Sequence, residues 1–154
     1  MKQKLGIFII LAILVGVLFA IKQGAFTIKN EGYAKVKIPD VVDYNFHIKP
    51  ILSDKCYTCH GPDANKRKAG LRLDLEENAF SELPESPGKH ALVAGRPNMS
   101  MLYKRIVSED SEEVMPPSDS QLKLNPHEKE LIKKWIKQGA KFEKHWAYIP
   151  PVKS

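Results

Sequence analysis

Cysteine is scarce in this chain of 154 residues, because Cys56 and Cys59 are the only two. Two cysteines three residues apart cannot staple a small domain, so the sequence excludes a disulfide-rich scaffold. In an oxidising compartment such a pair either closes into a strained, reactive disulfide or takes part in other chemistry. The cysteine spacing is therefore the first feature that points to a function.

Acidic residues are missing from the first thirty positions, and the formal net charge is +6. Three of these charges belong to Lys2, Lys4 and Lys22, so the chain after residue 24 carries only +3. This excess is too small, and too little interleaved with aromatic residues, to predict nucleic-acid binding. It indicates a mild preference for acidic or anionic partners.

The segment from Leu5 to Ile21 lacks charged residues and proline, and its length reaches the lower limit for a membrane-spanning helix. A clear small-residue cleavage site and a lipobox cysteine are both absent. Residues 1–24 are therefore predicted to form an uncleaved hydrophobic signal anchor, with a cleaved signal peptide as the alternative. The anchor would hold the domain at the periplasmic side of the inner membrane, and cleavage would release it as an exported soluble protein.

Residues 25–41 lack helical periodicity and are predicted to be a linker to a domain over residues 42–151. Apolar residues at helical spacing then predict a helix that leads to Cys56. This helix is expected to begin near Asn45, because a proline such as Pro50 breaks a helix when it lies deep inside. The remaining predictions are an extended segment at 71–73, a loop at 81–97, a short helix after Pro97 and a loop at 108–124.

The last predicted helix has the clearest signals. Asn125 is suited to cap it, Pro126 to its first position, and Glu128 to its third. Gly139 is expected to end it. The domain is therefore predicted to be mostly α with long loops, and its few helices would bury little core unless a bulky apolar cofactor filled the centre. The expected apolar face of this helix consists of Leu131, Ile132, Trp135 and Ile136.

The run Cys56-Tyr57-Thr58-Cys59-His60 has the spacing that attaches haem c. Two cysteines on one turn of helix reach the two vinyl groups on one edge of the porphyrin as thioethers. The following histidine then lies under the ring and presents its imidazole to the iron. Cys56, Cys59 and His60 are therefore predicted to hold one covalent haem.

Two other uses of the cysteine pair are disfavoured. A thioredoxin-like redox pair is found in a βαβ context, which the sequence does not predict here. A zinc site needs a second pair of ligands at suitable spacing, and no further cysteine is present.

A second axial ligand is expected from the segment that contains Met115. The two prolines after it stiffen the loop, and a residue before proline is pushed into an extended conformation. Such a loop can hold a thioether against iron. Met99 and Met101 are rivals, but they lie at the start of a predicted helix and are expected to pack or to face solvent. Four histidines could in principle give bis-histidine coordination but are expected to lie on the surface or in packing: His47, His90, His127 and His145.

Two charged runs flank these residues. Lys66, Arg67 and Lys68 follow the cysteine motif and could dock an acidic redox partner, although a solvated loop is favoured slightly. Glu109, Asp110, Glu112 and Glu113 precede Met115 and are predicted to be a solvated loop rather than paired catalytic acids.

Several phrases occur in the order typical of one family, and together they resemble the planctomycete-type cytochrome c domain. The resemblance covers about residues 42–151. It lies in Asp43-Tyr44-Asn45, Ile48-Lys49-Pro50-Ile51-Leu52, Cys56-Tyr57-Thr58-Cys59-His60-Gly61-Pro62, Lys66-Arg67-Lys68-Ala69-Gly70-Leu71-Arg72-Leu73-Asp74, Met115-Pro116-Pro117, Trp135-Ile136 with Gly139-Ala140, and His145-Trp146 with Pro150-Pro151.

The resemblance implies a class I-like cytochrome c fold, with haem on Cys56, Cys59 and His60 and with Met115 as distal ligand. Phe46-His47 departs from the family, which commonly has a charged pair there. Relatives also usually continue past the last motif into larger domains, so this chain is either a stand-alone haem module or the front of a longer protein.

The function predicted is therefore that of a monohaem c-type cytochrome that transfers single electrons and is not an enzyme. A haem-based sensor and an accessory redox domain of a larger oxidoreductase are the alternatives. Its partners are expected to be a redox protein with an acidic surface and, through the anchor, the membrane.

Overall fold

The computed structural model describes residues 36–144, together with Val15 and Phe19 of the N-terminal segment. The chain divides into two compact units, Met1–Gly32 and Tyr33–Ser154. No helix within the described residues is long and apolar enough to cross a membrane. Apart from these two positions, the predicted signal anchor at 1–24 lies outside the described residues, as does most of the predicted linker.

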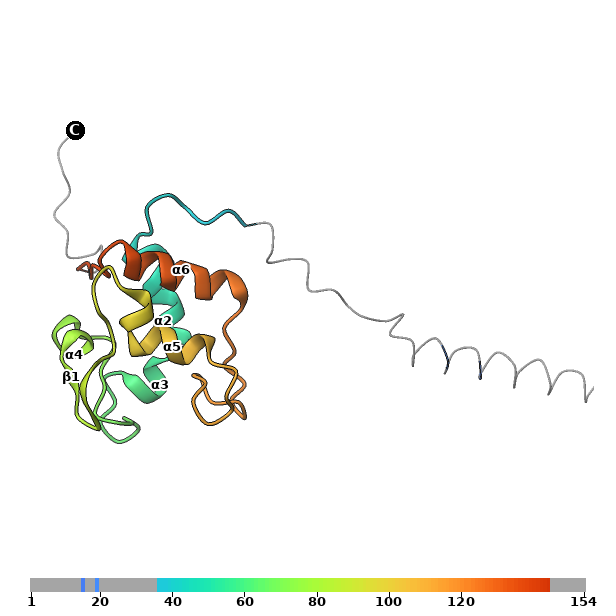
Figure 1. Cartoon of the computed structure of the whole chain (residues 1–154), viewed down its shortest axis with the longest axis horizontal. Coiled ribbons are helices and arrows are strands. Elements are labelled where there is room, and N and C mark those ends of the chain that lie inside the picture. The colour runs from blue at the N-terminus through green and yellow to red at the C-terminus, as the bar shows by residue number, and fades with distance from the viewer. Residues whose placement is uncertain (1–14, 16–18, 20–35, 145–154) are drawn as a thin grey trace, which may run out of the picture. The chain divides into compact units, whose positions relative to one another are not determined.

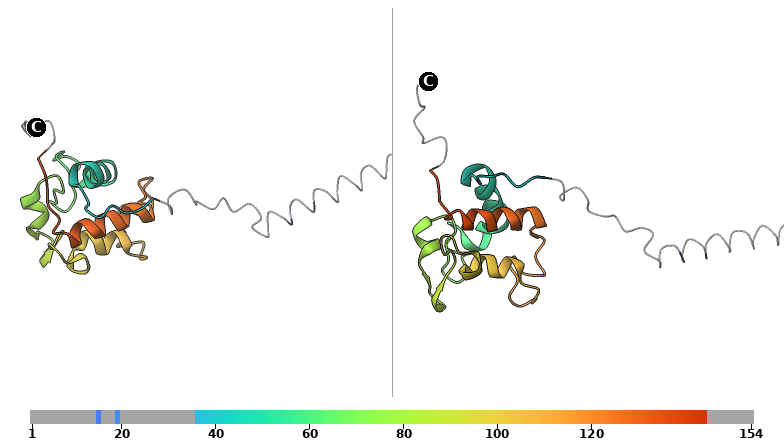
Figure 2. Two further views of the ribbon diagram at one scale, coloured as in Figure 1. Left: turned by 90° about the horizontal axis from the view of Figure 1, so that it is seen from above. Right: turned by 45° about the horizontal axis from the view of Figure 1, so that its top comes forward.

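The second unit is rich in helix, and its described part also contains one small two-stranded sheet (Figures 1 and 2). The prediction of a helix-rich domain is therefore confirmed. In chain order the elements are η1 (Tyr44–Ile48), α2 (Lys49–Lys55), α3 (Tyr57–His60), α4 (Glu76–Phe80), β1 (Glu82–Leu83), β2 (Ser86–His90), η2 (Pro97–Met99), α5 (Met101–Val107) and α6 (Pro126–Lys137).

The helical segment that leads to the cysteines begins at Tyr44, one residue before the predicted start. The Asp43 carboxylate caps it and accepts a hydrogen bond of 2.8 Å from the Phe46 N–H. The opening turn is wider than an α-helix, and the Lys49 N–H donates to the Tyr44 carbonyl. Pro50 follows as the second residue of α2, where a missing N–H costs little.

Helix α6 begins and ends as predicted. Asn125 and Glu128 form a reciprocal capping box, with the Glu128 N–H 2.9 Å from Asn125 Oδ1 and the Asn125 N–H 2.7 Å from Glu128 Oε2. At the other end Gly139 has a φ of 107°, and its N–H donates to the Ile136 carbonyl at 3.0 Å. All four residues of the predicted apolar face are buried, namely Leu131, Ile132, Trp135 and Ile136.

Helix α6 packs against η1 and α5 (Figure 1), and the apolar side chains of its inner face are buried. Ile48 and Ile132 are completely buried. The ring of Tyr44 lies 5.9 Å from that of Trp135 and 4.8 Å from that of Phe142, measured between centroids. The Trp135 side chain also donates a hydrogen bond of 3.0 Å to a backbone carbonyl, so its polar atom is satisfied. These contacts form a conventional core.

The prediction of a loop over 81–97 is wrong for residues 82–90, which form an antiparallel hairpin. Glu82 pairs with His90 and Leu83 with Ser86, with an irregular register between the two pairs. The strands are too short to show alternation, and Pro87 obscures them further. Helix α4 at 76–80 was also not predicted, and the expected extended segment at 71–73 forms no strand. The predicted short helix after Pro97 is confirmed as α5.

Candidate functional site

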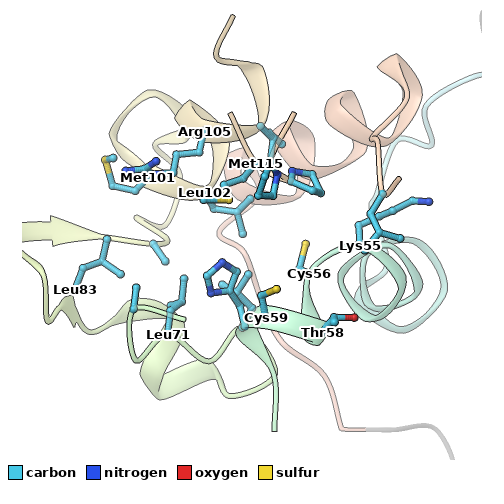
Figure 3. Close-up of a pocket in the computed structure, with 18 of the residues that line it drawn as sticks. Lys55, Cys56, Thr58, Cys59, Leu71, Leu83, Met101, Leu102, Arg105 and Met115 are labelled. Carbon is cyan, nitrogen blue, oxygen red and sulfur yellow. The ribbon is translucent and has the colours of Figure 1, made fainter. Parts of the chain in front are cut away.

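A cavity of about 290 Å³ opens between the α2–α3 junction and helix α5 (Figure 3). Its wall is mainly apolar, and its volume is near the lower end of sites that hold organic ligands. The residues come from the α2–α3 junction, the segment 69–73, the hairpin, helix α5 and the segment 115–122. Five elements far apart in the sequence therefore share one hollow.

Cys56, Cys59 and His60 line this cavity together. Cys56 forms the joint between α2 and α3, and its carbonyl accepts hydrogen bonds from Cys59 at 3.1 Å and His60 at 2.8 Å. Both thiols are free. The short helical turn thus brings the three residues predicted for haem attachment onto one wall.

Gly61 follows the histidine and has no room for a side chain. A Cβ there would lie 2.4 Å from the Tyr57 carbonyl oxygen and 2.8 Å from the Tyr57 Cβ. Real Cβ atoms do not approach so closely, and the carbonyl cannot move without unwinding α3. The turn that presents the two thiols and the imidazole therefore requires glycine directly after His60.

The His60 imidazole is partly buried, and its Nδ1 atom is buried without a hydrogen-bond partner among the described residues. Burial lowers the pKa of His60, the nearby backbone of Lys68 opposes this, and the charge of Arg105 lowers the pKa further. A neutral imidazole is the form that binds a metal. The histidine is thus held in a state suited to ligation.

Burial raises the pKa of the Cys56 thiol to about 12, with smaller contributions from Asp54 and Cys59. A reactive redox pair needs the opposite shift, because the thiolate is the nucleophile. The surroundings of Cys56 therefore do not suit thioredoxin-like exchange.

The loop after the motif folds back on it. Lys68 N–H donates to the Cys59 carbonyl at 2.8 Å. The Arg67 guanidinium donates to the Gly61 carbonyl at 3.2 Å and to the Pro62 carbonyl at 3.0 Å. Arg67 is therefore part of the loop structure, and Lys66 and Lys68 are the exposed cations of the predicted docking patch.

Met115 lines the cavity from the wall opposite Cys59, and Arg105 and the more distant Met101 lie on the same side (Figure 3). Its N–H donates to the Arg105 carbonyl at 3.0 Å, which ties the segment to α5. Met99 is 59% exposed, as expected for a residue that faces solvent. Met101 lies in the cavity wall. It is therefore a closer rival to Met115 than its position at the start of a helix suggested.

The histidines proposed as rivals do not line the cavity in the part of the chain that the structure describes. His90 Nδ1 lies 2.9 Å from the Phe80 carbonyl, and His47 Nδ1 lies 2.9 Å from the Asp43 nitrogen. His127 lies in the first turn of α6, outside the cavity wall. His145 is outside the described residues. The acids before Met115 are exposed, as predicted for a solvated loop, namely Glu109, Asp110, Glu112 and Glu113.

Several lining residues had no signal in the sequence. Leu83, Glu85 and Ser86 reach the cavity because the unpredicted hairpin forms one wall. Arg105 lines the cavity from α5. The apolar pattern of this helix marks Leu102 and Ile106 but not Arg105. The helical spacing of α5 predicts that Arg105 lies beside Leu102. It does not predict the cavity that both residues line.

The residues present fit a covalently held haem. A buried imidazole nitrogen without a partner, two free thiols and a thioether surround a cavity with an apolar wall. In c-type haem the two cysteine sulfurs bond to the porphyrin, and an imidazole and a methionine thioether bind the iron. The site therefore defines a cytochrome c-type haem protein.

Residues 56–119 match the family model described as Planctomycete cytochrome C. The resemblance is confirmed over these residues, which make up less than half of the chain. No curated protein and no solved structure matches the chain. The His145-Trp146 and Pro150-Pro151 parts of the resemblance lie outside the described residues.

Proposed function

We propose that this protein is a monohaem c-type cytochrome that transfers single electrons outside the cytoplasm. The observation that carries the proposal is the meeting of Cys56, Cys59, His60 and Met115 around one cavity, although 59 positions separate the first from the last. A single haem follows from the cysteine count, because two thioethers use both cysteines of the chain.

Each residue has a separate task in this proposal. Cys56 and Cys59 would hold haem through two thioether bonds, and His60 would supply an imidazole to its iron. Met115 would supply a thioether from the opposite wall of the cavity, which would raise the reduction potential relative to a second histidine. When bound, haem supplies an iron that alternates between two oxidation states.

The apolar wall of the cavity supports electron transfer rather than substrate chemistry. Leu71, Leu73 and Leu102 line it and would keep water from the iron. Among the described residues, the one carboxylate in the lining is Glu85, and the exposed acid run before Met115 lies outside the cavity. A paired general acid and base is therefore not part of the site.

The proposal includes a class I-like cytochrome c fold. It is supported by the packing of η1, the first helix of the domain along the chain, against α6, the last. It also includes attachment by the apolar segment Leu5–Ile21 to the periplasmic side of the inner membrane. Lys66 and Lys68, exposed beside the cysteine motif, support docking of an acidic redox partner.

The proposal is tested by producing the chain in a host that attaches c-type haem. The denatured wild type should give the haemochrome spectrum of two thioether bonds, and Cys56→Ala combined with Cys59→Ala should lose the covalent haem. A wild type that remains without haem in such a host would overturn the proposal.

The sixth ligand is tested in the same host with Met115→Ala and its matched rival Met101→Ala. The near-infrared charge-transfer band between methionine and ferric iron should disappear in the first variant and persist in the second. Rapid carbon monoxide binding by the reduced wild type would instead favour the haem-sensor alternative.

A further inference from the structure

The segment that bears Met115 borders two cavities rather than one. The first is the candidate haem cavity, and the second, of about 260 Å³, lies on another side of the same segment. Met115, Pro116, Pro117 and Ile106 line both cavities. Haem in the first cavity would contact the segment on one side. On the other side, the second cavity leaves space into which the segment could move. Packing alone therefore does not hold Met115 towards the iron.

Hydrogen bonds to helix α5 supply the missing restraint, and both that join residues 113–117 to α5 in the described part of the chain involve Arg105. The Met115 N–H donates to the Arg105 carbonyl at 3.0 Å. The Arg105 guanidinium donates from Nη1 to the Glu113 carbonyl at 3.1 Å. Arg105 thus forms hydrogen bonds to the segment through both its own backbone carbonyl and its own side chain.

The guanidinium also belongs to the haem cavity, since Arg105 lines it beside Leu102 and Met115 (Figure 3). We infer that Arg105 is the positioning residue that holds the Met115 thioether against the iron by bracing the 113–115 backbone. This inference rests on the proposed function, in which Met115 is the distal ligand. It adds a residue that contacts the ligand segment without itself binding iron.

The test is a competition for the sixth coordination position of the ferric haem protein. Added imidazole displaces a methionine ligand more easily when the segment that bears it is less restrained. Arg105→Gln removes the charged donor, so imidazole should bind about fivefold more tightly than in wild type, the size expected for one partly exposed hydrogen bond. Arg105→Lys keeps one charged donor and should recover part of the difference.

Two control variants distinguish loss of the Arg105 hydrogen bond from a change in the charge of the helix or of residue 113. Lys104→Gln removes a positive charge from the neighbouring, exposed position of the same helix. Glu113→Gln alters the residue that accepts the bond but leaves its carbonyl in place. Both should bind imidazole as wild type does. An equal gain in Lys104→Gln would overturn the inference, because it would show that helix charge and not the hydrogen bond is responsible.

Met115→Ala distinguishes failure of the inference from failure of the proposed function. If Met115→Ala loses the charge-transfer band while Arg105→Gln binds imidazole as wild type does, Arg105 has no positioning role and the proposed ligand stands. If Met115→Ala keeps the band, the ligand assignment is wrong and the inference falls with it. Equal haem content and thermal unfolding midpoints in the variants would show that they are folded.

Discussion

The two sides of this domain differ in how their apolar residues find partners. On one side η1, α2 and α6 enclose a core in which Ile48 and Ile132 are completely buried and three aromatic rings contact one another. On the other side α3, the hairpin, α5 and the Met115 segment surround a cavity of about 290 Å³. We call these the packed side and the hollow side.

The difference shows where the fold is complete by itself. Side chains of the packed side satisfy one another, and the polar atom of Trp135 is hydrogen bonded. The hollow side contains a half-buried His60 imidazole whose pKa is lowered by burial and a Cys56 thiol whose pKa is raised by burial to about 12. The proposed haem would bond to both cysteines and to the His60 imidazole on this side.

The largest expected effect concerns the Cys56 thiol on the hollow side, measured in a haem-free Cys59→Ala chain. The thiolate is the form that alkylates, so a pKa of about 12 makes the native thiol unreactive at neutral pH. At pH 8 iodoacetamide should label native Cys56 roughly a thousandfold more slowly than in denaturant, where the pKa returns to about 8.5.

The pH dependence of the labelling rate tests whether burial controls the reactivity of Cys56. Native labelling, followed by mass spectrometry, should rise about tenfold with each pH unit up to about pH 11, whereas labelling in denaturant should level off above about pH 8.5. A native rate that levels off near pH 9 would show that burial does not control this thiol.

A smaller effect compares the same substitution on the two sides. Leu52→Ala empties a position that is 1% exposed on the packed side and should cost about 2–5 kcal/mol of unfolding free energy. Leu71→Ala, which borders the cavity, should cost about 1 kcal/mol or less in the haem-free chain, because part of its surface has no protein partner.

Urea unfolding of both variants, with and without haem, makes this measurement. With haem in place Leu71→Ala should cost more, since the cofactor then provides the missing contact. Equal losses in the haem-free chain, or the absence of a cooperative transition in the haem-free wild type, would contradict the division into two sides.

The smallest effect tests the helix that organises the packed side. Asn125→Ala removes one half of the α6 capping box and should lower the unfolding free energy by about 1 kcal/mol, with or without haem. Asn65→Ala, at an exposed asparagine of the loop after the cysteine motif, is the matched control and should change it little. A loss confined to the haem-bound form would mean that α6 supports the hollow side instead.

Local signals in the sequence predicted much of the packed side. The capping residue, the spacing of apolar residues and the terminal glycine of α6 act within the helix itself, so they could be recognised without knowing any neighbour. The start of η1 was predicted to within one residue because Pro50 restricts where an α-helix can begin.

The hairpin and the cavity wall could not be predicted in the same way. Strands of two and five residues, one of them containing proline and glycine, are stabilised by pairing rather than by local preference. Met101 was expected to pack or face solvent because helix spacing alone does not reveal a hollow beside the helix. No local pattern marks Arg105, because its partners are backbone atoms of another segment.

The sequence by itself determined which residues are proposed to attach haem, because two cysteines and a histidine on one short turn are close together whatever surrounds them. It also determined the main helices, whose caps and apolar faces are local. Only the tertiary structure decided that Met115, Met101 and Arg105 line the same cavity as that turn, and that a second cavity borders the Met115 segment. Those relations depend on contacts between distant segments, which no local pattern encodes.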